Sequence, residues 1–315
     1  MLSNRDIGRF FGRGVLFALL NVPIAIAIWA IPNATNGDAT WESPSVFSTM
    51  PRNEHFDYVF MGTSHARYFS ITKPNHETVE RLLGGKLLNI AQNAAGPHIQ
   101  SVYLSYFLSR GNSADTIIYL VDPWAVAHET WNRTFTFQRE PFRPRAAMEM
   151  VRHGLPVRGI IADYAVFNLQ GRSFSREGNP FPPLDRVEPS GDPVPDFYIE
   201  SRANFLNGPW RDLDIDHLQN GYTQYLLSIA ETARARDTTM IFVFPSTLIP
   251  PQKVQAQLSE VLSDHEKEYE YQLLDFSEAI TDHQYFNDPD HLNTVGIEHF
   301  ISNFLAPAIA GRPSL

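Results

Sequence analysis

The stretch DYVFMGTSHARYF, residues 57–69, is an apolar run that stops abruptly at a glycine, a threonine and a serine. Short apolar runs bounded by glycine are typical of buried strands, and Gly62 allows the chain to leave the strand sharply. Ligands of open parallel sheets bind at the carboxyl ends of the strands. The pattern therefore predicts that Ser64 lies at the mouth of a sheet, where its hydroxyl could act as a nucleophile. The alternative is a serine that only caps the following helix.

Four further apolar runs share this character, at residues 86–92, 116–123, 239–246 and 271–277. Amphipathic segments that read as helices lie between and after the runs, at 75–84, 98–110, 217–236, 251–267 and 294–309. Strands that are apolar throughout are buried on both faces, as in parallel sheets. The alternation of strands and helices therefore predicts an α/β fold in which a parallel sheet lies between two layers of helices.

Residues 125–215 interrupt this pattern, because they contain no convincing buried strand. A structureless loop of that length is implausible inside a compact domain. We interpret the segment as an inserted lobe with short helices near 144–153 and 156–169 and a proline-rich arm. Such a lobe either shapes access to a site or docks another protein, and the sequence leaves both alternatives open.

Composition and charge exclude several classes of function. The 315 residues are 43% hydrophobic, which is enough apolar material for a full core. The net charge of −10 and the absence of a basic run argue against a nucleic-acid partner. Cysteine is absent, which excludes thiol catalysis, cysteine-ligated metal and disulfides.

The N-terminus resembles a membrane anchor. Arg5, Arg9 and Arg13 precede residues 14–31, an uncharged stretch just long enough to cross a bilayer as a helix. Arginines that flank one end of a membrane helix keep that end in the cytoplasm. The main domain, which follows the other end, is therefore expected on the outer side of the inner membrane. The alternatives are a buried core helix and a cleaved signal peptide, whose apolar region is usually shorter and ends at a better cleavage site.

The predicted organisation has five parts. They are a cytoplasmic N-terminus (1–13), a transmembrane anchor (14–31), a connector (32–53), a main domain (54–124 and 216–315) and the inserted lobe (125–215).

A second chemical element is FNDPDHLNTVGIEHF, residues 286–300. A serine nucleophile needs a base, and the base needs a carboxylate that holds its tautomer. Asp288 and His291 supply both groups on one turn before the last predicted helix. The alternatives are a capping aspartate beside a surface histidine, or a metal pair with Asp290. A metal site is disfavoured because the sequence has no second cluster of histidines and carboxylates with the spacing of metal ligands.

A third element lies between a predicted strand and a helix, in LNIAQNAAGPHIQSVYLSYF, residues 88–107. Gly96 could bring a backbone N–H close to a reacting carbonyl, and the helix start favours a developing oxyanion. The alternative is an ordinary loop. His65 adjoins Ser64, but adjacent residues on such a turn point apart, so we expect His65 to contact substrate or pack. The alternative in which His65 is the base stays open.

The order of these three elements resembles that of the SGNH/GDSL hydrolase superfamily over residues 56–123 and 239–309. The resemblance implies a three-layer, flavodoxin-like α/β/α fold. It also implies that Ser64, in GTSH where the family usually has Gly-Asp-Ser, is the nucleophile. His291 would then be the base, Asp288 its orienting carboxylate and Gly96 the oxyanion glycine.

The chain departs from the family at its third block. The family's Gly-x-Asn-Asp should fall near YLVDPWAV, residues 119–126, which contains no asparagine. Asn93 or a backbone amide is the expected substitute in the oxyanion hole. Asp122 is expected to have a structural role at the end of its strand.

With its expected anchor, the chain resembles the membrane-anchored SGNH proteins of alginate O-acetylation and lipoteichoic-acid D-alanylation. That resemblance implies acyl transfer to or from a cell-envelope glycan or lipid through a Ser64 acyl-enzyme, without a cofactor. It also implies a membrane-bound O-acyltransferase as partner. Two alternatives stay open, a periplasmic SGNH esterase or deacylase and a non-catalytic docking subunit of an acyltransferase complex.

Overall fold

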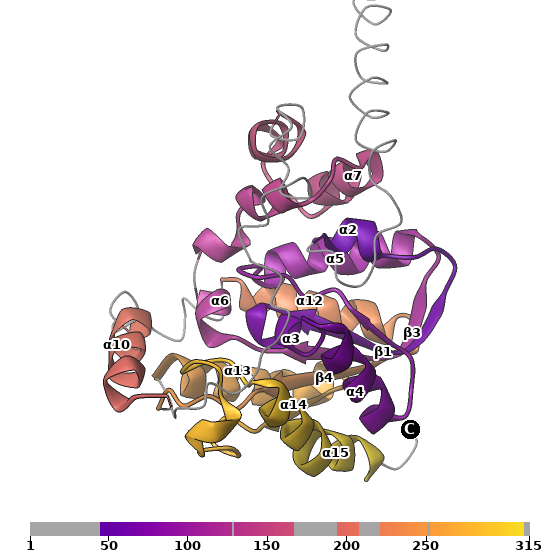
Figure 1. The fold of residues 1–315 in the computed structure, drawn as a ribbon. Coiled ribbons are helices and arrows are strands. Elements are labelled where there is room, and N and C mark those ends of the chain that lie inside the picture. Colours follow the sequence, from indigo (N-terminus) through magenta and orange to yellow (C-terminus); the bar gives the residue numbers. More distant parts are fainter. Residues whose placement is uncertain (1–44, 128, 167–193, 208–220, 251–252, 312–315) are drawn as a thin grey trace, which may run out of the picture.

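The computed structural model describes residues 45–127, 129–166, 194–207, 221–250 and 253–311 (Figure 1). Within these residues, no helix has both the length and the apolar character needed to cross a bilayer. The expected anchor, residues 14–31, lies outside them.

The core of the molecule is a sheet of five parallel strands, as predicted. Each strand falls within or overlaps one of the five apolar runs: β1 His55–Gly62, β2 Leu87–Asn89, β3 Ser113–Leu120, β4 Thr239–Phe244 and β5 Tyr271–Asp275. The strand order is β2-β1-β3-β4-β5, the order of flavodoxin-like sheets. This order reverses direction between β1 and β3, and ligands of such sheets bind at that reversal.

The strands are apolar throughout because helices cover both faces of the sheet. On β3, Ile117 and Tyr119 join one core cluster, whereas Ile118 and Leu120 join the other. Successive side chains of a strand point to opposite faces. An uninterrupted apolar run therefore fills both cores at once, which is why the sequence pattern located the strands.

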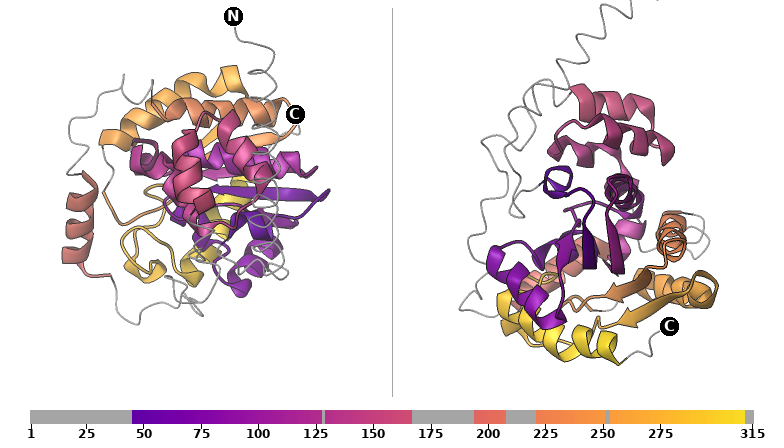
Figure 2. Two further views of the ribbon diagram at one scale, coloured as in Figure 1. Left: turned by 90° about the horizontal axis from the view of Figure 1, so that it is seen from above. Right: turned by 90° about the vertical axis from the view of Figure 1, so that its right-hand side faces the viewer.

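Two helical layers enclose the sheet (Figures 1 and 2). One layer contains α2 Val46–Thr49, α5 Pro97–Ser109, α12 Thr223–Arg234 and α13 Lys253–Tyr269. The other contains α3 Ser64–Tyr68, α4 Lys73–Leu83, α14 Thr294–Phe300, the π-helix η6 Ile301–Leu305 and α15 Ala306–Ala310. The predicted three-layer α/β/α architecture is therefore the one observed.

The segment 125–215 contains helices and no strand where the structure describes it. They are α6 Pro123–Ala127, η1 Glu129–Asn132, η2 Thr134–Arg139, α7 Pro144–Arg152, α8 Val157–Gly159, η3 Ile160–Val166 and α10 Asp196–Asn207. The helices expected near 144–153 and 156–169 correspond to α7 and to α8 with η3. Helix α10 was not expected from the sequence.

The end of the expected connector forms part of the core. Phe47 in α2 packs against Tyr103, Phe137 and Tyr164, with ring centroids 5.2–6.2 Å apart. The buried Glu140 carboxylate accepts hydrogen bonds from the backbone N–H groups of Val46 and Phe47, each at 2.9 Å. The start of α2 is thereby fixed to the helices that follow β3.

Gly62 should tolerate substitution least among the glycines at the sheet edge. Its φ is +131°, and a Cβ there would lie 2.5 Å from the carbonyl oxygen of Leu120 on the neighbouring strand. Gly62→Ala should lower the free energy of unfolding by about 3 kcal/mol, since backbone strain and overpacking each cost roughly 1–3 kcal/mol.

Gly84→Ala is the matched control for this substitution. Gly84 also has a positive φ, +73°, but a Cβ there would meet nothing within 4 Å. Only the left-handed conformation then costs energy, roughly 1–2 kcal/mol. Urea unfolding of both variants tests the comparison, and equal losses would show that the contact with Leu120 is unimportant.

Candidate active site

Ser64 is the first residue of α3 and follows β1 at the reversal of strand order. The preceding residue, Thr63, donates its hydroxyl proton to the buried carboxylate of Asp122 at 2.9 Å. Asp122 follows β3 and also accepts the backbone N–H groups of Trp124 and Ala125. Asp122 therefore ties the ends of two adjacent strands together, the structural role expected for it.

The loop that carries Asp288 and His291 is held by its own hydrogen bonds. Asp288 Oδ1 accepts the backbone N–H groups of Asp290 and His291, each at 3.0 Å. Asn293 ends the loop, and its side chain caps α14 by accepting the N–H of Gly296 at 2.9 Å. The spacing of aspartate and histidine thus places both groups on one tight turn, as the sequence predicts.

Ser64, His291 and Asp288 lie in one hydrogen-bonded line. The Ser64 Oγ is 2.8 Å from His291 Nε2, and His291 Nδ1 is 2.9 Å from both carboxylate oxygens of Asp288. An ionised carboxylate only accepts, so Nδ1 carries the ring proton of the neutral histidine. Nε2 is then left to accept the proton of the Ser64 hydroxyl, the arrangement that activates a serine.

Electrostatics support this arrangement. Burial by itself lowers the pKa of His291, but the hydrogen bond and charge of Asp288 outweigh it, so this pKa is raised above its ordinary value. For Asp288, burial raises the pKa, and the hydrogen bond and charge of His291 more than reverse that effect. Asp288 therefore remains ionised and stabilises the imidazolium that forms when His291 takes a proton.

Tyr68, which sequence reasoning did not single out, packs on His291. Its ring stacks on the His291 imidazole, with centroids 4.4 Å apart and planes 17° apart. Burial, followed by the charges of Asp288 and Asp290, raises the pKa of Tyr68 to about 12. Tyr68 therefore stays neutral at ordinary pH and holds one face of the imidazole.

His65 is brought beside His291 but lacks the contacts of a base. Its ring centroid is 5.1 Å from that of His291, and its Nδ1 is 3.6 Å from Asp122 Oδ2. Neither ring nitrogen of His65 has a hydrogen-bond partner among the described residues. Burial lowers its pKa, so the ring is neutral. The geometry favours His291 over His65 as the base.

The turn after β2 lies close to Ser64 in the fold. The backbone N–H of Gln92 donates to the carbonyl of Gly62 at 3.2 Å, two residues before Ser64. Asn93 follows Gln92, and its buried side-chain oxygen has no hydrogen-bond partner among the described residues. Asn93 therefore remains a candidate contact for a bound group.

The geometry of Gly96 does not fit the oxyanion role expected for it. Its backbone N–H donates to the carbonyl of Trp131 at 2.6 Å, so this group is already engaged. Gly96 is required for a different reason, because a Cβ there would lie 2.5 Å from the side chain of Asn132. Asn132 accepts the N–H of His98 at the start of α5. The sequence offered no local signal for this contact between segments far apart along the chain.

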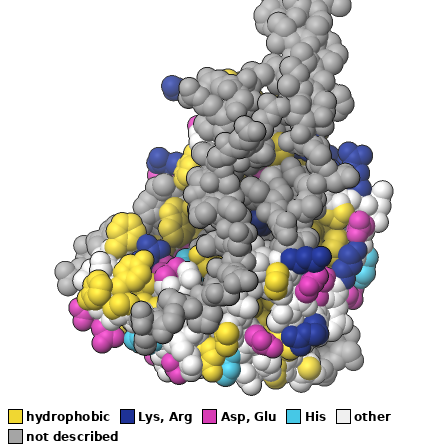
Figure 3. Space-filling model, viewed as in Figure 1, with side chains coloured by type: hydrophobic (Ala, Val, Ile, Leu, Met, Phe, Trp, Pro, Cys, Tyr) yellow, Lys and Arg dark blue, Asp and Glu magenta, His cyan; other side chains and the backbone are white. Residues whose placement is uncertain are grey.

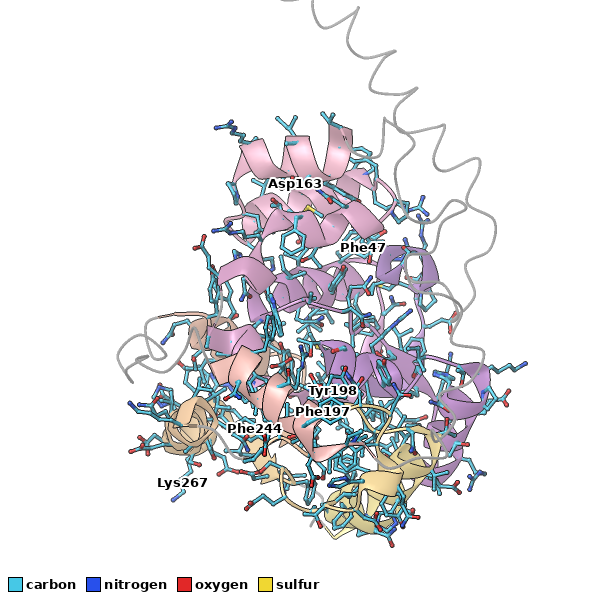
Figure 4. All side chains as sticks on the ribbon, turned by 60° about the vertical axis from the view of Figure 1, so that its left-hand side comes forward. Phe47, Asp163, Phe197, Tyr198, Phe244 and Lys267 are labelled. Carbon is cyan, nitrogen blue, oxygen red and sulfur yellow. The ribbon has the colours of Figure 1, made fainter. Side chains whose placement is uncertain are left out.

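Helix α10 contacts the loop that carries Asp288 and His291 through an ion pair. The Arg202 guanidinium donates to both carboxylate oxygens of Asp290, at 3.2 and 2.9 Å from Nε. Asp290 is buried, whereas Arg202 is partly exposed. Figure 4 shows Phe197 and Tyr198 on the same helix, and hydrophobic side chains gather over α10 in Figure 3. The segment after β3 therefore forms part of the rim of the site.

Removal of Arg202 should destabilise the loop. Arg202→Met leaves the buried Asp290 carboxylate without its cation, and breaking a buried pair costs roughly 3–5 kcal/mol. Because Arg202 is partly exposed, we expect a smaller loss of unfolding free energy, about 1–3 kcal/mol. Urea unfolding measures it, and adding Asp290→Asn should recover part of the loss. A double variant that loses the sum of both single effects would contradict the pairing.

Two groups of described side chains have ligand atoms within 4.8 Å of one another, the separation at which they could share a metal ion. They are His65 with Asp290 and His291, and His55 with Asp57 and Asp115. In the first group, Arg202 already binds Asp290, and both ring nitrogens of His291 serve Asp288 and Ser64. In the second group, His55 and Asp115 are exposed and Asp57 is half-buried, and all three lie near the amino ends of β1 and β3, away from Ser64. Neither group therefore resembles a preformed metal site.

A search of protein-family models found no match to this chain, and a search of curated proteins found none either. Among solved structures, a proposed acylhydrolase from Bacteroides fragilis NCTC 9343 is similar to it, with 12% sequence identity and a TM-score of 0.41. The similarity covers 83% of this chain and 91% of that chain. A likeness this remote carries no weight for the activity, which must be argued from the geometry of the site.

Proposed function

We propose that the protein is a serine acyl-transfer enzyme of the SGNH type with Ser64 as its nucleophile. The observation that carries the proposal is the hydrogen-bonded line of Ser64, His291 and Asp288, with distances of 2.8 and 2.9 Å. These three side chains match the nucleophile, base and orienting carboxylate of acyl-transfer chemistry. Their position at the strand-order reversal supports the same conclusion.

The proposed reaction has two stages. In the first, Ser64 Oγ attacks the carbonyl carbon of an acyl ester while His291 Nε2 takes the hydroxyl proton. The tetrahedral intermediate expels the alcohol, which receives this proton from His291, and an acyl-enzyme remains. In the second stage, water or a sugar hydroxyl attacks the acyl carbon and gives its proton to His291. The bond from that carbon to Ser64 Oγ then breaks, His291 returns the proton to Ser64, and the acyl group leaves as a carboxylic acid or as an ester of the sugar. Hydrolysis and transfer differ only in the acceptor.

Asn93 is our candidate for a side-chain donor to the oxyanion, through its amide nitrogen Nδ2, because it follows Gln92 on the turn that binds Gly62 beside Ser64. If it serves this role, Asn93→Ala should lower turnover of an activated ester by roughly 10²–10³, the usual effect of one lost donor. His65→Ala is the comparison, because His65 makes no hydrogen bond to Ser64 in the structure and should cost far less. Turnover and thermal unfolding of both variants test the assignment. An Asn93 variant with full activity would contradict it.

We further propose that the chain is anchored by residues 14–31 in the inner membrane, with the described domain outside the cytoplasm. The uncharged stretch and its three preceding arginines support the anchor. In this position the enzyme would transfer an acyl group to or from an envelope glycan or lipid, with a membrane-bound O-acyltransferase as partner. Transfer is favoured over release to water by the resemblance to anchored SGNH proteins.

The test is covalent labelling followed by acceptor competition. A fluorophosphonate probe should label the full chain and fail to label Ser64→Ala. An activated acetyl ester is then supplied with and without an envelope polysaccharide, and acetylated glycan is measured beside free acetate. Acetyl on the glycan supports a transferase, and acetate alone supports the esterase alternative. Absence of labelling would overturn the proposal that the protein is an enzyme and would favour a docking subunit.

A further inference from the structure

The outer surface of α7, α8 and η3 is apolar where a solvent-facing surface should be polar. Met148, Val151, Val157 and Ile161 have exposed fractions of 53–57%. The inner sides of the same segments pack into the core through residues such as Met150 and Tyr164. Helices at the surface of a soluble protein usually present polar residues on the outer side. We call these four exposed residues the α7–η3 face.

The charge around the α7–η3 face is positive although the chain as a whole carries −10. Residues 143–166 contain four arginines and two acidic residues, and Arg145, Arg152 and Arg158 are exposed. Glu149 is buried and binds Arg152 in an ion pair at 2.8 Å, and Asp163 accepts a hydrogen bond from Thr134. The positive charge of this surface therefore comes mainly from Arg145 and Arg158. Apolar residues flanked by arginines are typical of surfaces that lie in the interface of an anionic bilayer.

The start of the described chain lies on the same side of the sheet. Figure 1 shows α2 between α5 and α7, and Figure 4 places Phe47 close to the helices that carry Asp163. Only 13 residues separate Ser45 from the end of the uncharged stretch at Ile31. Fully extended, this segment spans about 50 Å at most. Phe47 in α2 also packs on Tyr164 in η3, so an anchor at residues 14–31 would place the α7–η3 face on the tethered side of the domain.

We propose that the α7–η3 face rests on the surface of an anionic lipid bilayer. Its four apolar side chains enter the boundary between headgroups and acyl chains, and its arginines contact lipid phosphates. The inference rests on the anchor of the proposed function but not on its acyl chemistry. Bilayer contact on this face would hold the mouth of the sheet in a fixed orientation to the membrane, beside an enzyme embedded there.

The experiment uses the absence of cysteine in the chain. Single variants Met148→Cys and Ile161→Cys in the full chain are labelled with an environment-sensitive fluorophore. Lys267→Cys on α13, far from Asp163 in Figure 4, and Phe197→Cys on α10 are the exposed controls. Each protein is placed in nanodiscs of phosphatidylcholine and phosphatidylglycerol in equal parts, with nitroxide-labelled lipid as quencher. We expect quenching at 148 and 161 to be roughly twofold or more above both controls.

Charge reversal and enzyme labelling separate the outcomes. Arg145→Glu with Arg158→Glu should remove the excess quenching at 161 and leave fluorophosphonate labelling of Ser64 unchanged. If quenching at positions 148 and 161 equals that of the controls, the bilayer contact is overturned. If Ser64 is still labelled in the same protein, the proposed acyl chemistry is unaffected by that result. A label that is shielded from water but not quenched by lipid would also overturn the bilayer contact, because another part of this chain or a second copy then covers the face.

Discussion

Ser64→Ala and His291→Ala should each reduce acyl release from an activated ester by about 10⁶-fold, nearly as much as the double variant. Ser64→Ala removes the oxygen that forms the acyl-enzyme. His291→Ala removes the group whose Nε2 lies 2.8 Å from that oxygen, so the hydroxyl loses its proton acceptor. Because each residue is useless without the other, the two losses should not add.

Acyl release and fluorophosphonate labelling measure this effect, and thermal unfolding confirms that each variant is folded. The matched control is His65→Ala, a histidine beside His291 that makes no hydrogen bond to Ser64 in the structure. A well-folded His65 variant as inactive as the His291 variant would give the base role to His65. Losses that multiply in the double variant would contradict action as a unit.

Asp288→Asn should lower turnover by about 10⁴-fold while the fold is kept. The amide can donate to His291 Nδ1, which favours the tautomer with the proton on Nε2 and blocks acceptance from Ser64. The same substitution removes the hydrogen bond and charge that raise the pKa of His291, so burial then lowers this pKa.

The pH profile gives a second measurement of the role of Asp288. His291 acts as a base only when neutral, and its raised pKa places the acidic limb of kcat/KM above the ordinary histidine value of about 6.5. In Asp288→Asn the pKa of His291 is lower, so the acidic limb of the kcat/KM profile should move to lower pH than in the parent protein. A limb that stays in place would show that Asp288 does not control the proton affinity of His291.

Much of the fold was predictable from local pattern. A strand buried on both faces must be apolar along its whole length, so the five runs located the five strands. The Asp288 and His291 pair was predictable as well, because a spacing of three residues closes within one turn. The sequence also predicts a sharp turn of the chain at Gly62 where β1 ends, and the φ of +131° at this residue agrees with that prediction.

Other features could not be read in this way. Helix α2 has only four residues and no visible periodicity, so the sequence pattern does not distinguish it from a connector. Helix α10 follows a proline-rich stretch, and its contact with the site comes from Arg202 and Asp290, which are 88 residues apart. The anchor at residues 14–31 lies outside the described residues and stays a prediction.

The strands, most of the helices and the turns that carry Ser64 and His291 can be read from local sequence, because each depends on neighbours along the chain. Which of those groups come into contact depends on the packing of the whole chain. Ser64 and His291 are 227 residues apart, and they come together because parallel strands bring their carboxyl ends to one edge of the sheet. The same packing directs the N–H of Gly96 to Trp131 and leaves His65 without a hydrogen-bond partner among the described residues. Such contacts join distant segments, and no spacing along the chain encodes them.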